Sequence, residues 1–350
     1  MRILIIKLGS IGDILHTLPA FAAIRRALPD AHIAWVAERR SAEILRGNHL
    51  IDELVEVDTH GLRARMGIDD ALSDMSRQIR HLRKQKFDIA IDFQGLLKSA
   101  FIGQLSGAKR RWGFSKKTLR EPPSRFLLTD TADVPSDVHV VKKNLILASQ
   151  ALDLDLHSTE LEFPIFTTQN DKLEADAIIA KAGQRFAILN PAGGWVTKLW
   201  HAEKFGRLVD HLWAKHGIVS VVATGPKETE LAEKVAAAST SKKLILEQPG
   251  LNGFYELAKR AAVYVGGDTG PTHLAVAAKA PVVGLFGPTE WWRNGSPYAE
   301  DICVDRSDIG CRIDCQRRKC DVWICMDFGL DAVAAAVEER MARAAAHVYV

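Results

Sequence analysis

The chain has 350 residues, of which 47% are hydrophobic and 25% are charged. These proportions are close to those of an average soluble globular protein, so they exclude a disordered chain, a collagen-like chain and a small disulfide-bonded scaffold. Lysine and arginine exceed aspartate and glutamate by three, a small net charge that does not by itself indicate a nucleic-acid binder. The length favours two domains.

The apolar start of the chain superficially resembles a signal peptide, but Lys7, Gly9 and Asp13 interrupt it. We therefore expect a buried strand over Ile3–Ile6 that is followed by a turn. No apolar run reaches about 18 residues, so we expect no transmembrane helix. Without an export signal, the predicted location is the cytoplasm, where thiols stay reduced.

Short apolar runs alternate with helical stretches through the first half of the chain. Because these runs are apolar on both faces, they predict buried parallel strands in a doubly wound sheet. The alternation weakens between about Lys109 and Pro135 and again across Leu152–Asp171. The expected strands are Ile3–Ile6, His32–Ala37, Leu54–Val57 and Phe87–Asp92, with a charged helix over Asp70–Lys84.

A second series of the same kind follows, which predicts a second Rossmann-like unit. Its expected strands are Phe186–Asn190, Ile218–Thr224, Leu244–Leu246, Ala262–Val265 and Val282–Phe286. Its expected helices are Ala202–Lys215, Glu228–Ala238, Gly253–Arg260 and Thr272–Ala278. The fold class is therefore α/β, with Rossmann-like doubly wound parallel-sheet domains over residues 1–165 and 166–328. Residues 329–350 contain a C-terminal helix.

Ligands of doubly wound sheets bind in the loops at the carboxyl ends of the strands. The first such loop contains Gly9 and Gly12, which let backbone N–H groups approach an anion. A dinucleotide fingerprint needs three glycines in a G-x-G-x-x-G pattern, and this loop has only two. Glu38 only partly imitates the ribose-binding acid of an NAD site. A nicotinamide-dependent oxidoreductase is the alternative function that this loop leaves open.

Asp13 has two interpretations. An aspartate at this place can cap the amino end of a helix. It can also act as a general base, since a carboxylate of ordinary pKa is ionised at neutral pH. Pro19 predicts that the following helix either kinks or begins near Thr17.

The loop after Val265 combines small residues, hydroxyl groups and a helix start, which suits a diphosphate. His273 lies in the first turn of that helix, where ligand contact is favoured over a role in core packing. Lys198, which follows another glycine-rich loop, is a candidate point charge for a leaving phosphate.

Four of the five cysteines lie close together in the sequence. Cys311 and Cys315 have the spacing of a metal knuckle. Reduced thiols are the leading interpretation, and a structural metal site and a disulfide remain open. The candidate metal site consists of Cys311, Cys315, Cys320 and Cys325.

Three motifs together resemble the lipopolysaccharide heptosyltransferase family, glycosyltransferase family nine. They are Asp268–His273 with Gly287–Thr289, then Lys7–Pro19, then Asp92–Ala100. The last motif, with Arg120–Pro122, is most similar to heptosyltransferase I, the branch that adds the first heptose to Kdo-lipid A.

The resemblance implies a GT-B fold, in which two Rossmann-like domains face each other and a C-terminal helix crosses back to the N-terminal domain. It implies an inverting transfer of heptose from ADP-heptose to the Kdo-lipid A inner core, without a metal ion or other cofactor. A transferase of the same family with another donor or acceptor is the nearest alternative. A non-catalytic sugar-nucleotide-binding protein is a third.

The resemblance also implies residue roles. Asp13 is the expected general base, and Lys198 neutralises the departing diphosphate. The expected donor contacts are Gly9, Ser10, Gly12, Thr197, Glu228, Asp268, Thr269, Gly270 and His273. The expected acceptor contacts are Arg63, Gln94, Lys98 and Arg120.

Two local basic clusters, Lys109–Arg120 and Arg77–Lys86, lie within this nearly neutral chain. Such runs are usually solvated faces, but an anionic lipid A-type acceptor would also attract them to the inner leaflet. The clusters predict that the protein associates peripherally with the inner membrane. We also expect it to be a monomer. Nucleic acid is not an expected partner, because no recognised module is present.

Overall fold

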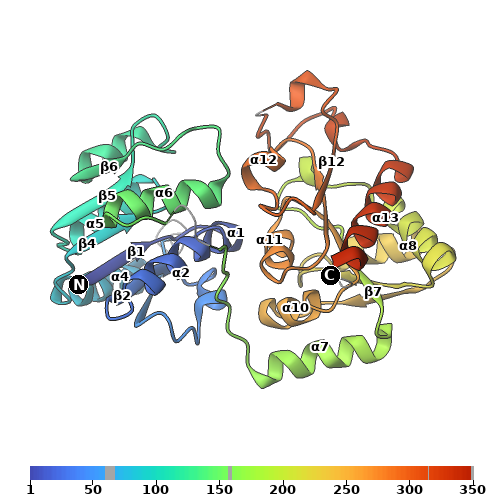
Figure 1. The fold of residues 1–350 in the computed structure, drawn as a ribbon, viewed down its shortest axis with the longest axis horizontal. Coiled ribbons are helices and arrows are strands. Elements are labelled where there is room, and N and C mark those ends of the chain that lie inside the picture. The colour runs from blue at the N-terminus through green and yellow to red at the C-terminus, as the bar shows by residue number, and fades with distance from the viewer. Residues whose placement is uncertain (60–67, 157–159, 314, 348–350) are drawn as a thin grey trace. The chain divides into compact units, whose positions relative to one another are not determined.

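The computed structural model describes residues 1–59, 68–156, 160–313 and 315–347, and for residues 68–74 and 347 it describes the backbone alone. The chain divides into two compact units, Met1–Phe166 and Thr167–Val350 (Figure 1). The division falls one residue from the boundary expected between residues 165 and 166.

In the described residues, the first unit carries six parallel strands in the order β3-β2-β1-β4-β5-β6. This order reverses direction between β1 and β4, so the carboxyl ends of these neighbours form the switch point of a Rossmann sheet. The strands are β1 (Arg2–Ile6), β2 (His32–Glu38), β3 (Glu53–Val57), β4 (Ile89–Asp92), β5 (Arg110–Phe114) and β6 (Asp130–Ala132).

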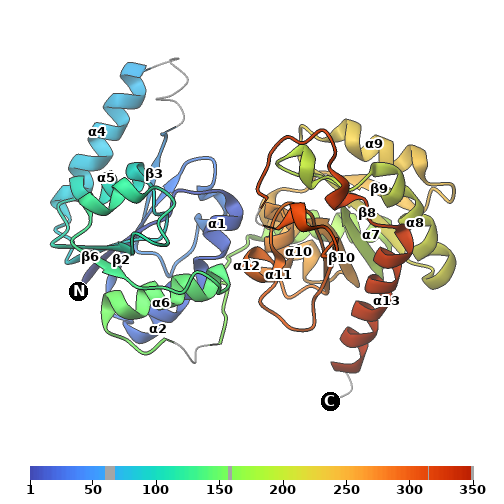
Figure 2. The same ribbon diagram turned by 90° about the horizontal axis from the view of Figure 1, so that it is seen from above.

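Helices cover both faces of this sheet (Figure 2). Helices α2 and α6 pack together on one face, and α4 and α5 pack together on the other. Both faces of the central strand are consequently buried: Leu4 joins the core beneath α4 and α5, and Trp35 of β2 packs on Phe21 of α2. The helices are α1 (Ile11–Leu15), α2 (Leu18–Ala27), α4 (Ile68–Lys84), α5 (Leu97–Leu105) and α6 (Val140–Leu152), with short 3-10 turns η1 (Ala42–Leu45) and η2 (Pro122–Leu127).

The second unit repeats this topology over its described residues. Read outward from β9, its six parallel strands follow the order β9-β8-β7-β10-β11-β12, so β7 and β10 again flank the switch point. The strands are β7 (Phe186–Asn190), β8 (Val219–Ala223), β9 (Leu244–Glu247), β10 (Val263–Gly267), β11 (Val282–Phe286) and β12 (Ile302–Asp305).

Alternate residues of β10 face two helical layers. Val263 and Val265 join the core formed with α8 and α13, whereas Tyr264 faces α10 and α11. The helices are α7 (Gln169–Ala182), α8 (Ala202–His216), α9 (Thr229–Ala238), α10 (Leu251–Ala258), α11 (Gly270–Ala277), α12 (Trp291–Asn294) and α13 (Leu330–His347), with 3-10 turns η3 (Val196–Lys198), η4 (Gly310–Arg312) and η5 (Ile324–Met326).

Helix α13 packs against α8 and strands β10 to β12, and its buried Val333, Val337 and Met341 complete the core of the second unit. The expected packing of residues 329–350 on the N-terminal domain stays a prediction. The alanine-rich sequence indicated a helix, but only the buried stripe shows which core it completes. No helix in the described part of the chain combines the length and hydropathy needed to cross a bilayer.

All nine predicted strands are present, and the strands that the sequence missed lie where apolar patterning is weak. Strands β5 and β6 fall in the basic stretch where the alternation faded, because they carry half-exposed charged side chains such as Arg111 and Asp130. Near Pro19, the structure has a break: α1 ends at Leu15, and α2 begins after Thr17 with the proline in its first turn.

Candidate active site

The first candidate cluster lies at the switch point of the first sheet. Ile6 of β1 lies beside Asp92 of β4, so the segments after these two strands meet. The buried Lys7 ammonium donates to the Phe93 carbonyl at 2.8 Å and lies 3.7 Å from the Asp13 carboxylate. Burial lowers the pKa of Lys7, and the charge of Asp13 opposes that effect. Lys7 thus presents Asp13 with a compensating cation.

Asp13 is not the cap residue of α1 but its third residue. Ser10 is the cap: its hydroxyl accepts from the Asp13 N–H at 3.3 Å, and the Asp13 carboxylate accepts from the Ser10 N–H at 3.2 Å. A Cβ on Gly9 would stand 2.5 Å from that carboxylate, so the close approach requires glycine. The capping role and a chemical role coexist, because only Oδ2 makes the capping bonds while Oδ1 faces Lys7.

Gln94 and Asp92 hold the neighbouring loop. The Gln94 amide oxygen accepts from the Gly9 N–H at 2.7 Å, which ties the two switch-point loops together. The buried Asp92 accepts from the Gln94 N–H, the Gly95 N–H and the Ser99 hydroxyl. Burial raises the pKa of Asp92 to about 6, and these hydrogen bonds only partly offset it. Gln94 therefore positions the Gly9 loop. Its contact with the acceptor stays a prediction.

Lys98 is bound to protein partners. Its ammonium donates to Glu38 at 3.2 Å and to the Thr59 hydroxyl at 3.0 Å. Glu38 is buried and also accepts from the Thr59 backbone N–H, so its carboxylate serves this local network. The hydrogen bonds to Thr59 and Lys98 therefore explain why a buried acid lies at the place of the ribose-binding acid of an NAD site.

Arg120 is exposed, and its charge helps to lower the pKa of the nearby Lys7. Its backbone lies beside Gly95, and the Glu121 N–H donates to the Gly95 carbonyl at 3.1 Å. The structure therefore brings Arg120 to the Gln94 loop, as an acceptor contact requires. Arg63 lies outside the described residues.

The second cluster lies at the switch point of the second sheet. The Lys198 ammonium donates to the Asp268 carboxylate at 2.7 Å and to the Asp268 carbonyl at 3.1 Å. His273 Nε2 lies 3.2 Å from the other carboxylate oxygen. Burial opposes ionisation of Asp268, but His273 and Lys198 outweigh it and hold its pKa well below the usual range. The cluster is a buried, ionised carboxylate between two nitrogen partners.

The loop after β10 leads directly into α11. Thr269 is the cap residue, and its side chain makes no capping hydrogen bond to the helix. Thr272 is buried, contacts the Tyr264 hydroxyl at 2.9 Å and donates to the Gly267 carbonyl. The first turn of α11, which includes Gly270, is thereby fixed to the sheet with its amide groups at an amino end suited to an anion.

Thr197 and Glu228 act on the loops around this cluster. Thr197 is buried and donates to the Arg317 carbonyl at 2.7 Å. Glu228 precedes α9 and accepts from the Gly225 N–H at 2.7 Å, so one carboxylate oxygen shapes the loop after β8. In the described residues, Asn190 Oδ1 and Thr224 Oγ1 are buried without a hydrogen-bond partner at the ends of β7 and β8. A buried polar group of this kind needs a hydrogen-bond partner, which a bound ligand or a water molecule would supply.

All four cysteines of residues 311–325, hereafter the cysteine segment, are free thiols, from the exposed Cys311 to the buried Cys325. Burial raises the pKa of Cys325, and the other three cysteines reinforce the shift. Among the described residues, His211, His216 and Glu338 have ligand atoms within 4.8 Å of one another, and no three cysteines reach that spacing. Reduced thiols and a structural metal site both stay predictions.

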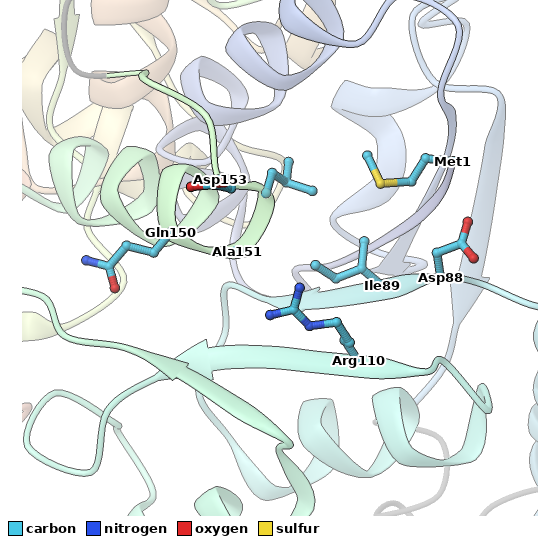
Figure 3. A pocket seen from close by; sticks show the side chains of 8 residues that line it. Met1, Asp88, Ile89, Arg110, Gln150, Ala151 and Asp153 are labelled. Atoms are coloured by element: carbon cyan, nitrogen blue, oxygen red, sulfur yellow. The ribbon is translucent and has the colours of Figure 1, made fainter.

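Figure 3 shows a surface pocket of the first unit. Strands β1, β4 and β5 begin there, so it marks the amino edge of the first sheet, opposite the switch point. Its Asp88 already accepts from the Arg2 N–H at 2.9 Å and Lys109 at 2.7 Å. We assign no chemistry to it. The lining residues are Met1, Asp88, Ile89, Arg110, Gln150, Ala151, Leu152 and Asp153.

Sequence reasoning missed Lys7 and Asp92 as site residues, although both lay inside recognised motifs. Their signal was a charged residue within or directly after an apolar strand, which is costly to bury without a partner. It also missed Trp195, whose ring lies 4.3 Å from the Lys198 ammonium.

Two doubly wound parallel-sheet units of this kind are the architecture of the GT-B fold class. Residues 75–321 match the family described as glycosyltransferase family 9 (heptosyltransferase). The chain therefore belongs to glycosyltransferase family 9, as its motifs predicted.

Named relatives agree. The chain is 28% identical over 320 residues to lipopolysaccharide heptosyltransferase 1 of Pseudomonas aeruginosa, covering 91% of this chain and 87% of that protein. It is 27% identical over 291 residues to the protein of the same name from Escherichia coli K12, covering 83% and 89%. The fold is similar to that of E. coli heptosyltransferase WaaC, solved with ADP, with a TM-score of 0.79, 24% identity and coverage of 97% and 100%.

Proposed function

We propose that this protein is an inverting heptosyltransferase that moves heptose from ADP-heptose to the Kdo-lipid A inner core of lipopolysaccharide without a metal ion. The observation that carries the proposal is the pair of switch-point clusters, one built around Asp13 and one around Lys198 and Asp268. The names of the relatives, and the ADP in one solved relative, support the donor and the acceptor.

The proposed step is a single displacement at the anomeric carbon. The acceptor hydroxyl loses its proton to the Asp13 carboxylate, and its oxygen forms the new bond to the anomeric carbon. The bond from that carbon to the diphosphate oxygen breaks, and its electron pair leaves with ADP. Attack opposite the leaving group inverts the configuration.

The second unit would stabilise the leaving diphosphate. Lys198 uses two of its three N–H donors on Asp268 among the described contacts, which leaves one for a phosphate oxygen. The first-turn amides of α11 add fixed positive dipoles. Because these groups are held before the reaction begins, they cost no reorganisation when negative charge develops. A metal ion is then unnecessary.

An exposed apolar surface in the first unit supports peripheral contact with the inner membrane. The solvent-accessible fractions are 44% for Leu97, 52% for Phe101 and 90% for Phe126. Helix α5, which carries the first two, packs against η2, which carries the third. Exposed Lys116 and Arg120 belong to the same part of the unit, so apolar and basic groups together suit an anionic bilayer.

Transfer would be tested with purified protein, ADP-heptose and a Kdo-lipid A acceptor. We expect release of ADP, a product whose anomeric configuration by NMR is opposite to that of the donor, and equal rates with and without EDTA. Retention of configuration, or loss of activity in EDTA that Mg²⁺ restores, would contradict the proposed mechanism. A parallel screen of GDP- and UDP-sugars tests the alternative donors, since transfer from one of these alone would replace ADP-heptose.

Membrane contact has a separate test that needs no catalysis. We expect the protein to float with vesicles containing phosphatidylglycerol and to lose most of that binding in Phe126→Ser. The matched control is Leu173→Ser, because Leu173 of α7 is 55% exposed but belongs to the second unit. Equal binding by both variants would remove the assignment of this surface.

A further inference from the structure

The cysteine segment packs on the loops of the second candidate cluster. The Gln316 N–H donates to the Pro288 carbonyl at 2.9 Å, which joins the segment to the loop after β11. The Thr197 hydroxyl donates to the Arg317 carbonyl at 2.7 Å, which joins it to the turn that carries Lys198. Two bonds thus hold the middle of the segment at the carboxyl edge of the second sheet.

That middle part presents three consecutive cations. Arg317, Arg318 and Lys319 are all exposed. The Arg318 guanidinium carbon lies 5.3 Å from the centre of the Trp195 ring, and the Lys198 ammonium lies 4.3 Å from the same ring. Trp195 is therefore a shared platform for a cation from each segment.

The charge balance at Lys198 favours a second cation for a diphosphate. Asp268 is ionised and contacts Lys198 at 2.7 Å, so the positive charge of Lys198 is already compensated. A diphosphate brings two negative charges to a pair that is nearly neutral. Arg318 adds positive charge here, because it lies over the same Trp195 ring as Lys198.

We propose that Arg318, stacked on Trp195, is a further anion-binding residue that binds the diphosphate of a nucleoside-diphosphate sugar beside Lys198. The assignment rests on the proposed function only for the identity of that donor. A guanidinium that contacts an aromatic ring through a cation–π interaction keeps N–H donors for bidentate contact with phosphate oxygens. The two backbone bonds of the cysteine segment position Arg318 for this contact.

The test measures binding of inorganic diphosphate, ADP and adenosine by calorimetry. Arg318→Gln is expected to weaken inorganic diphosphate and ADP about tenfold and to leave adenosine unchanged, because only the phosphates contact the guanidinium. Trp195→Leu removes the platform and is expected to cause a similar loss. Arg317→Gln is the matched control: it removes the same charge one position away, keeps the carbonyl that Thr197 binds, and is expected to change affinity less than threefold.

Equal losses in Arg317→Gln and Arg318→Gln would show diffuse surface charge and overturn the assignment. Wild-type affinity in Arg318→Gln, or no binding of inorganic diphosphate and ADP by the wild-type protein, would overturn it as well. The proposed function fails by a different result. If the wild-type protein binds inorganic diphosphate in an Arg318-dependent way but transfers no heptose, the donor identity is wrong and the anion site remains.

Discussion

The two units use one backbone plan to make two electrostatically different sites. In each, a lysine after the first strand donates to the carbonyl of the residue directly after the fourth strand. Lys7 bonds the Phe93 carbonyl in the first unit, and Lys198 bonds the Asp268 carbonyl in the second. The same strand order therefore places a cation at both switch points.

The acids beside these lysines differ in their partners. Burial raises the pKa of Asp92 to about 6, because the hydrogen bonds that it accepts from two amide N–H groups and one hydroxyl only partly offset the cost of burying its charge. Asp268 is also buried but contacts Lys198 and His273 directly, so its pKa falls. Burial sets the cost of ionisation, and the charge of the nearest partner decides the sign of the shift.

Each unit also has a capping box at the amino end of a helix, so the capping role of an aspartate can be compared with its proposed chemical role. Ser10 and Asp13 form a capping box at α1, and Thr168 and Asp171 form one at α7. Only Asp13 has a buried lysine beside its carboxylate, at 3.7 Å. Asp171 thus supplies a matched control for the capping role.

The largest expected effect tests this difference. Asp13→Asn should lower kcat by about a thousandfold, because an amide cannot take the proton from the hydroxyl group of the acceptor. ADP binding by calorimetry should stay within about twofold of wild type. Asp171→Asn should lose similar helix-capping energy and keep its kcat. A comparable loss of kcat in both variants would reduce Asp13 to a capping residue.

Lys198→Gln should lower kcat by about a hundredfold, because one preorganised donor for the leaving diphosphate is lost. The reference variant is Lys181→Gln, which breaks an exposed ion pair with Glu247 at 2.7 Å and should leave kcat unchanged. Single-turnover rates with ADP-heptose would measure both. An unchanged rate in Lys198→Gln would mean that the second cluster only supports the fold.

Because the pKa of folded Asp92 is raised, the free energy of unfolding should fall as the pH rises. An unfolded aspartate titrates near about 3.9, whereas folded Asp92 has a pKa of about 6. Between these values the folded state holds the extra proton, so the contribution is complete below about pH 4 and is lost as pH rises through 6.

Urea unfolding of wild type and Asp92→Asn from pH 4 to 7 would show this. The free energy of unfolding of wild type, relative to the variant, should fall by up to about 3 kcal/mol across that range. A pH-independent difference would place Asp92 in a charged state throughout and remove its contrast with Asp268.

The smallest expected effect concerns the cysteine segment of the second unit. The exposed Cys311 should react with a thiol reagent at least about tenfold faster than Cys325, whose burial protects it and raises its pKa. Cys311→Ser should remove the fast phase. If instead all four thiols react slowly and a chelator makes them react faster, the structural metal site is favoured.

The sequence by itself determined the α/β class, the two units and the loops that carry the chemistry, because apolar periodicity and glycine placement are local signals. It named Asp13, Lys198, Asp268 and His273 through motifs. It did not find β5, β6 or β12, whose half-exposed residues blur the pattern.

Only the tertiary structure decided which of these residues meet. The bond from Lys7 to Phe93 joins residues 86 apart in the chain, and that from Lys198 to Asp268 joins residues 70 apart. Such pairs depend on strand order, which no local pattern encodes. The raised pKa of Asp92 and the stacking of Arg318 on Trp195 have the same origin, since burial and partner charge exist only after the sheets assemble.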